Sequence, residues 1–146
     1  MYTGLLHLHS FLRWVILILL LVSIFQSFSK SVGLKKTSLF LLIATHIQFL
    51  IGLYQWLVGG FGFNLIKENG FGEVMKNTVQ RFWAVEHITG MLIATILITA
   101  ARRKAKSGGY SAASWLYVIA LLLILALVPW PFRDDIARPW FPGMRS

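Results

Sequence analysis

The chain has 146 residues, of which 57% are hydrophobic and none is cysteine, and its formal net charge at pH 7 is +9. Its length predicts a single domain over 1–146, and its apolar share exceeds the roughly 45–50% of an average soluble domain. The lack of cysteine excludes disulfides, thiolate metal sites and a thiol nucleophile.

Four long apolar segments follow one another along the chain, at about 5–28, 38–58, 82–101 and 112–128. A helix rises ~1.5 Å per residue and the hydrocarbon core of a bilayer is ~30 Å thick, so roughly 17–25 apolar residues can cross it. The first three segments meet this length, and the fourth lies at its lower end and is stopped by Pro129. The sequence therefore predicts an all-α integral membrane protein, a four-helix bundle in up-down-up-down order.

The basic residues predict the orientation of this bundle. The connections after the first and third segments contain only basic charges, whereas the rest of the loop charge is mixed. Short loops rich in Lys and Arg stay on the cytoplasmic side, which places both termini outside and makes nucleic-acid binding an unnecessary explanation of the charge. The cytoplasmic set is Lys30, Lys35, Lys36, Arg102, Arg103, Lys104 and Lys106, and the outer set mixes Lys67, Lys76, Arg81, Arg133, Arg138 and Arg145 with Glu68, Glu73, Asp134 and Asp135.

Two further stretches lie on the predicted outer side. The long connection 59–80 is rich in glycine, and its second half favours a short helix with Val74, Met75 and Val79 on the apolar side. The stretch after Pro129, PWPFRDDIARPWFPG, alternates aromatic and charged residues in the way that is typical of the headgroup layer.

Ionisable residues inside the predicted spans gather toward the outer side. Measured from the outer helix ends at ~1.5 Å per residue, His9, Glu86 and His87 lie about 6–8 Å deep and Arg13 about 12 Å deep. His46 lies deeper, about 18 Å from the outer end of its helix. Buried charges in a membrane usually face the bundle interior and pair, so we expect an Arg13–Glu86 ion pair, or an anionic cofactor group beside Arg13.

The histidines occupy three of the four helices and suggest a cofactor. His9 and His87 are almost level on the first and third helices, which are diagonal in such a bundle, and neutral imidazole is a preferred axial ligand of haem iron. His7 points away from His9 in a helix and replaces it as the ligand only if the helix starts late. His46 lies opposite the polar stripe of Thr45, Gln48, Gly52 and Gln55, on a helix that we expect to be enclosed on most sides.

Four motifs resemble a group of small four-helix bacterial membrane proteins that are catalogued as cytochrome b-like. They are HLHSFLRW in the first helix, THIQFLIGLYQW in the second, RFWAVEHITGM in the third and PWPFR after the fourth. The resemblance spans nearly the whole chain and implies a haem-bearing electron carrier of the bacterial inner membrane, with His7 or His9, His46 and His87 as the motif histidines. The larger cytochrome b families use paired histidines for two haems, and this chain offers no second level pair.

The leading hypothesis is a b-type cytochrome with one haem b per chain, an electron-transfer protein rather than a stand-alone enzyme. Its ligands are His9 (or His7) and His87, and it exchanges electrons with quinol or a periplasmic partner, with Gln48, Gln55 or His46 as candidate quinone contacts. One alternative is a divalent-metal protein or transporter that uses His9, Glu86 and His87. Another is a cofactor-free accessory subunit of a larger membrane complex. The sequence does not determine whether the protein forms a homo-oligomer or belongs to such a complex.

Overall fold

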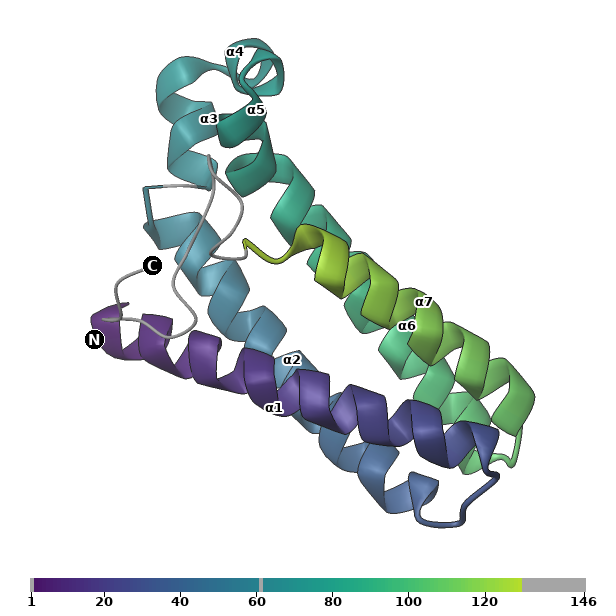
Figure 1. The fold of residues 1–146 in the computed structure, drawn as a ribbon. Helices are drawn as coiled ribbons and strands as arrows, with labels where there is room; N and C mark the ends of the chain where they lie inside the picture. The colour runs from purple at the N-terminus through teal and green to yellow at the C-terminus, as the bar shows by residue number, and fades with distance from the viewer. Residues whose placement is uncertain (1, 61, 130–146) are drawn as a thin grey trace.

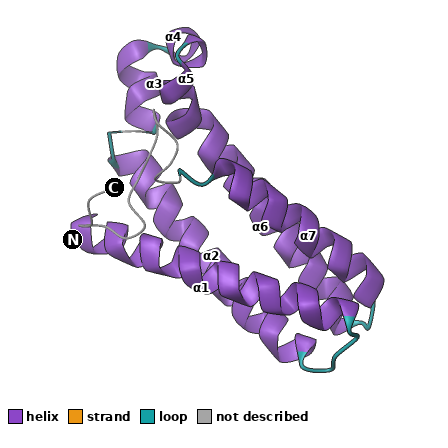
Figure 2. Cartoon of the chain, viewed as in Figure 1, coloured by secondary structure: helices purple, strands orange, loops and turns teal. Residues whose placement is uncertain are grey.

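The computed structural model describes residues 2–60 and 62–129, and this part of the chain consists of helices joined by short loops and contains no strand (Figure 2). The stretch after Pro129, with its predicted headgroup role, lies outside the described residues. Four long helices are long and apolar enough to cross a membrane, which confirms the predicted spans. They are α1 (Tyr2–Phe28), α2 (Leu34–Val58), α6 (His87–Lys106) and α7 (Tyr110–Leu127).

The observed helices extend beyond the apolar segments that predicted them. α2 begins at Leu34 and α6 continues to Lys106, so each includes basic residues at its end. Lys and Arg favour helices, and their long stems can lie along apolar surface while the charge reaches water, so a helix need not end where its apolar run ends. Hydropathy alone therefore predicted helices that were too short at these ends.

The four long helices pack as two pairs. α1 contacts α2 and α7, and α6 contacts α7 and α2, which leaves α1 and α6 on a diagonal of the bundle, as predicted. The turns 29–33 and 107–109 lie at the same end of the molecule, called here the turn end (Figure 1). The two pairs lie close together there and diverge toward the opposite end (Figure 1).

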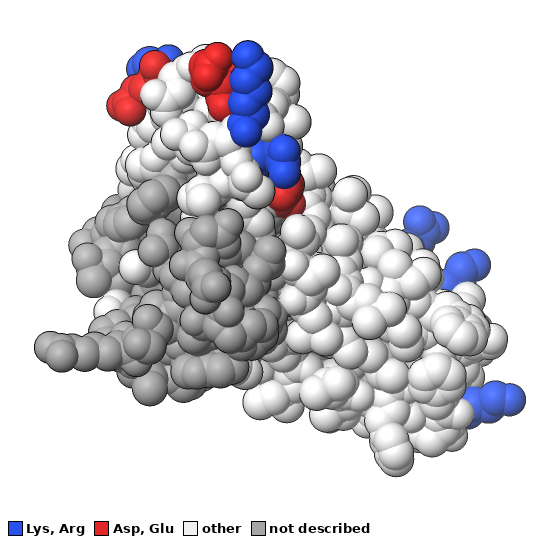
Figure 3. All heavy atoms as spheres, turned by 45° about the horizontal axis from the view of Figure 1, so that its top comes forward, with Lys and Arg blue, Asp and Glu red and all other residues white. Residues whose placement is uncertain are grey.

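The connection between α2 and α6 folds into three short helices, which we call the cap: α3 (Phe63–Asn69), α4 (Phe71–Lys76) and α5 (Thr78–Arg81). The prediction of a short helix in the second half of this connection is confirmed, and the first half is helical as well. Val74 is fully buried, whereas Met75 is exposed. The described acidic residues all lie in the cap or just after it, and only Lys and Arg are seen at the turn end (Figure 3).

The outer faces of the long helices are strongly apolar. Phe25, Leu50, Ile96 and Leu122, one from each long helix, are all more than half exposed. The expectation that α2 is enclosed on most sides is therefore wrong, because its Ile43, Ile47 and Leu50 face outward. Such exposed apolar faces are compatible with contact with lipid and are unusual on a soluble monomer.

Gly90 sets the distance between α6 and α7 near the cap. A Cβ atom at this position would overlap Cδ1 of Leu127, so the absence of a side chain permits the close approach of the two helices. We expect Gly90→Leu to lower the free energy of unfolding in detergent by about 1–3 kcal/mol, because overpacking forces the neighbouring side chain or helix to move. Thermal unfolding followed by circular dichroism measures this loss. Gly72→Leu is the control, since nothing lies within 4 Å of a Cβ there, and an equal loss in both variants would contradict the packing role of Gly90.

Candidate functional site

A cavity of about 550 Å³ lies between the long helices on the side of the cap. All four long helices line it, and its wall combines apolar side chains with a set of polar ones. The polar residues of α1 and α2 follow the helical period closely enough that each set forms one stripe along its helix. They are His9, Ser10 and Arg13 on α1, Thr45, Gln48 and Gln55 on α2, and His87 and Thr95 on α6.

His87 begins α6 and is held by the neighbouring helix. Its Nδ1 atom lies 2.7 Å from the backbone carbonyl of Leu127 on α7. Because a carbonyl can only accept, Nδ1 carries the proton in this contact, and Nε2 of the neutral ring keeps its lone pair. A histidine whose second nitrogen is fixed in this way is typical of metal-binding sites.

The residues just before His87 form a π-helical turn, η1 (Phe82–Glu86), in which the His87 N–H donates to the Phe82 carbonyl. The turn brings the rings of Phe82 and His87 to a centroid distance of 5.7 Å. Residues five apart lie ~140° apart around an ideal α-helix, so a regular helix would separate these rings. Single π-turns are frequent at functional sites, and nothing in the sequence pattern predicted this one.

Trp56 joins α2 to the π-turn. Its indole Nε1 donates a 2.8 Å hydrogen bond to the carbonyl of Ala84, and the side chain also lines the cavity. The contact fixes the level of α2 against the start of α6. Trp56 was not among the predicted site residues, although it lies four residues after Gly52 and therefore beside the polar stripe of α2.

His9 enters the cavity from α1 and lies against α2. The backbone carbonyl of His9 accepts a 2.8 Å hydrogen bond from Nε2 of Gln48. A Cβ atom at Gly52 would lie 3.3 Å from Nε2 of His9, so the glycine leaves free the space beside this ring nitrogen. Gln48 thus fixes the backbone at His9, and Gly52 leaves room for its ring.

Two glutamine side chains of the α2 stripe are incompletely bonded. Oε1 of Gln48 and Nε2 of Gln55 are buried and have no hydrogen-bond partner among the described residues. Both side chains line the cavity. An unpaired buried acceptor or donor costs ~1–3 kcal/mol, so these atoms favour a polar ligand or ordered water in the cavity.

Glu86 forms its ion pair with Arg81 and not, as predicted, with Arg13. Glu86 accepts from Nε of Arg81 at 3.4 Å, within the same stretch of chain, and it does not line the cavity. Arg13 does line the cavity. Its Nη2 lies 3.5 Å from Oγ of Ser10, and its guanidinium carbon lies 5.1 Å from the centroid of the Trp14 ring. The second alternative for Arg13, an anionic group of a ligand, therefore stays a prediction.

The other two histidines are not brought into the cavity. His7 is exposed on α1. His46 is exposed on α2, where its Nδ1 lies 2.8 Å from the carbonyl of Leu42 one turn earlier. The polar stripe and His46 lie on different faces of α2, and the structure turns the stripe inward.

The residues expected of a divalent-metal site do not assemble. Within 2–60 and 62–129, no group of three or more His, Cys, Asp or Glu side chains is close enough to hold an ion. Of the proposed set, His9 and His87 share the cavity and Glu86 does not.

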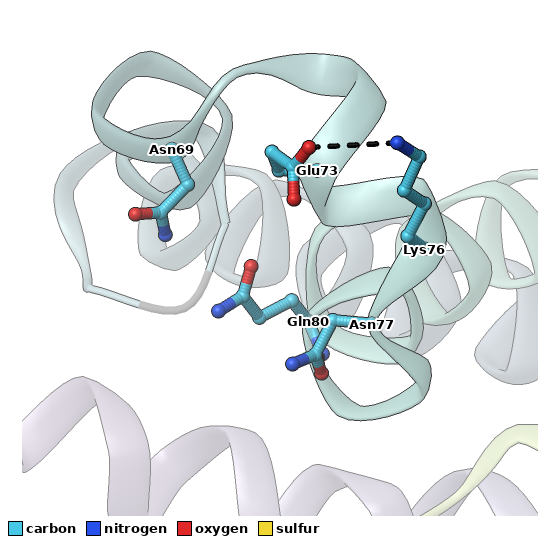
Figure 4. Close-up of a pocket in the computed structure, with 5 residues that line it drawn as sticks. All are labelled: Asn69, Glu73, Lys76, Asn77 and Gln80. Carbon is cyan, nitrogen blue, oxygen red and sulfur yellow. Dashed lines mark hydrogen bonds and ion pairs between the residues drawn. The ribbon is translucent and has the colours of Figure 1, made fainter.

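A second depression lies in the cap, between Asn69, Glu73, Lys76, Asn77 and Gln80 (Figure 4). Glu73 and Lys76 form an ion pair of 3.6 Å, and both side chains are largely exposed. The side chain of Asn77 accepts from the N–H groups of Val79 and Gln80, which caps α5. These groups are occupied in shaping the cap, so the depression is not the candidate site.

Comparisons of the chain with protein-family models, with curated proteins and with solved structures found no match. The resemblance to cytochrome b-like proteins therefore stays a prediction from the sequence motifs.

Trp56 supplies a test of the cavity's framework. We expect Trp56→Phe to destabilise the protein in detergent by about 1–3 kcal/mol, because the buried carbonyl of Ala84 loses its donor. Thermal unfolding measures the loss. The same substitution at the exposed Trp115 should change little, and equal stability of the two variants would show that the Trp56 bond does not hold α2 to the π-turn.

Proposed function

We propose that the protein is a membrane b-type cytochrome that binds one haem b in the cavity, with His9 and His87 as axial ligands. The observation that carries the proposal is the hydrogen bond of His87 to the Leu127 carbonyl. It leaves Nε2 as the ligating nitrogen of a ring that lines the same cavity as His9. The two histidines come from helices on a diagonal of the bundle, which suits ligands on opposite faces of one macrocycle.

The remaining lining fits the chemistry of a haem. The volume of about 550 Å³ falls in the range of roughly 300–1,000 Å³ that is usual for cofactor sites. Ile16, Met91 and Ile124 supply apolar wall for the macrocycle, and Arg13 supplies a positive charge for a propionate. Nε2 of Gln55 is an unused donor for the same kind of group.

When bound, haem supplies a reversible one-electron couple. The protein residues exclude water with the apolar wall, hold the ring of His87 in one tautomer and orient His9 against α2. Because His9 and His87 would both hold the haem iron, an exogenous ligand would be excluded, which favours electron transfer over oxygen chemistry. The proposed role is therefore that of an electron carrier and not of a stand-alone enzyme.

The proposed location is the bacterial inner membrane, with the turn end in the cytoplasm and the cap and both termini outside. The seven basic residues and the absence of acids in the turns and adjoining helix ends, over 29–38 and 102–109, support this orientation. Quinol or a periplasmic redox protein is the proposed electron partner.

The histidines provide the direct test. We expect the detergent-purified protein to show the absorption spectrum of a b-type cytochrome after dithionite reduction, with close to one haem per chain by pyridine haemochromogen assay. His9→Ala and His87→Ala should each lose most of the haem, because each removes a proposed ligand. His7→Ala and His46→Ala are matched controls and should keep it, since both side chains are exposed.

A colourless protein from cells supplied with haem would overturn the proposal and favour a cofactor-free subunit. Loss of haem in His46→Ala, with haem retained in His9→Ala, would show that His46 of α2 binds the haem and that His9 of α1 does not.

Gly52 provides a second test. We expect Gly52→Leu to reduce haem retention as strongly as His9→Ala, because the new side chain would fill the space beside Nε2 of His9. Haem content after gel filtration and the position of the reduced absorption bands measure the effect. Gly60→Leu is the control, since nothing lies within 4 Å of a Cβ there. Full haem content with an unshifted spectrum in Gly52→Leu would show that His9 is not bound in this position.

A further inference from the structure

An apolar layer separates the cavity from the turn end. Leu20 of α1, Leu41 of α2 and Ile98 of α6 are all fully buried and belong to one hydrophobic core. Ala120 and Ile124 complete this core from α7. In sequence the layer lies on the turn side of the cavity lining, because Leu20 follows Ile16 on α1, Leu41 precedes Thr45 on α2 and Ile98 follows Thr95 on α6.

Polar groups occur again on the other side of this layer. Ser23 lies three residues beyond Leu20, and Ser38 lies three residues before Leu41, both toward the turn end. Both are fully buried, together with Tyr117 of α7. The bundle thus has two polar regions, one at the cavity and one near the turns, with the Leu20–Leu41–Ile98 layer between them.

Most of the hydroxyl groups near the layer are bonded to their own helices. On the cavity side, Thr45 donates to the carbonyl of Leu41 at 2.7 Å and Thr95 donates to that of Met91 at 2.8 Å. On the turn side, Ser27 donates to the carbonyl of Ser23 at 2.6 Å and Ser114 to that of Tyr110 at 2.8 Å. Among the described residues, these bonds run within single helices, so they do not link the two polar regions.

Arg102 closes the turn side. Its Nη1 donates to the carbonyl of Lys35 and to Oγ of Ser38, both at 3.1 Å. The guanidinium thereby joins α6 to α2 directly below Leu41. The guanidinium therefore occupies the turn side of the layer with a charged group.

The lining of the cavity extends to Leu6 near the start of α1 and to Gly62, which directly precedes the cap. We infer that the cavity is reached from the cap end and is sealed from the turn end by the Leu20–Leu41–Ile98 layer. The part of the inference that concerns electron transfer rests on the proposed function. If the protein is a cytochrome, its one-electron partner would act at the cap face. Protons that accompany reduction would be exchanged on the same side.

The cysteine-free chain allows a direct test by labelling of single introduced cysteines with a charged, membrane-impermeant thiol reagent in sealed proteoliposomes. Asn69→Cys in the cap and Ser107→Cys in a turn are exposed, and their labelling identifies the two faces. Thr45→Cys reports on the cavity, and Ser38→Cys reports on the region beyond the layer.

We expect Thr45→Cys to react from the face that labels Asn69→Cys and not from the face that labels Ser107→Cys. Ser38→Cys should be protected from the cap face. Adding Leu41→Gly should open the layer and make Thr45→Cys reactive from the turn face as well.

Labelling of Thr45→Cys from the turn face in the otherwise native protein would overturn the inference, and so would a failure to label it from the cap face. Haem plays no part in this readout. A protein that lacks haem but shows the expected sidedness would overturn the cytochrome proposal and leave the inference about access intact.

Discussion

The hydrogen bond between the His87 ring and the Leu127 carbonyl joins the last turn of α7 to the first turn of α6. A backbone carbonyl near the end of a helix has no partner within that helix, and inside a membrane no water is at hand to replace it. The imidazole satisfies this carbonyl and is fixed in return. The close approach at Gly90, one turn further along α6, brings the two helices near enough for the bond to form.

The divergence of the helix pairs toward the cap follows from a change in residue size along the bundle. Near the turn end, Ala101, Ala105 and Ala113 of the α6–α7 pair are fully buried in one core with Leu20 of α1 and Leu41 of α2, and their small side chains allow the two pairs to pack closely. Toward the cap, the facing positions carry His9, Arg13, Gln48 and Trp56, which are too large and too polar to interdigitate in the same way. The helices therefore separate where the side chains change, and the cavity occupies the space that results.

The sequence predicted the parts of this structure that depend on one helix at a time. The four spans, the polar stripe of α2 and the diagonal pair that bears His9 and His87 follow from apolar length and helical period. The ends of α2 and α6 were placed too short because basic residues interrupt an apolar run without interrupting a helix. The prediction that Glu86 pairs with Arg13 was wrong, because Arg81, five residues earlier in the same stretch of chain, forms the ion pair with this carboxylate. The π-turn could not be predicted, since its geometry is supported by Trp56 from another helix.

The π-turn also has a consequence for how the protein can change. A turn of this kind contains one residue more than the α-helical turn it replaces, which is equivalent to a one-residue insertion at 82–86. Each residue advances an α-helix by ~100°, so the extra residue changes the angular register between the segment before it and the segment after it. α6 keeps its own contacts with α7 while the cap keeps a different orientation. Deletion of a single residue from 82–86 would therefore rotate the cap against the bundle, even though no residue of the cavity wall on α1, α2 or α7 had changed.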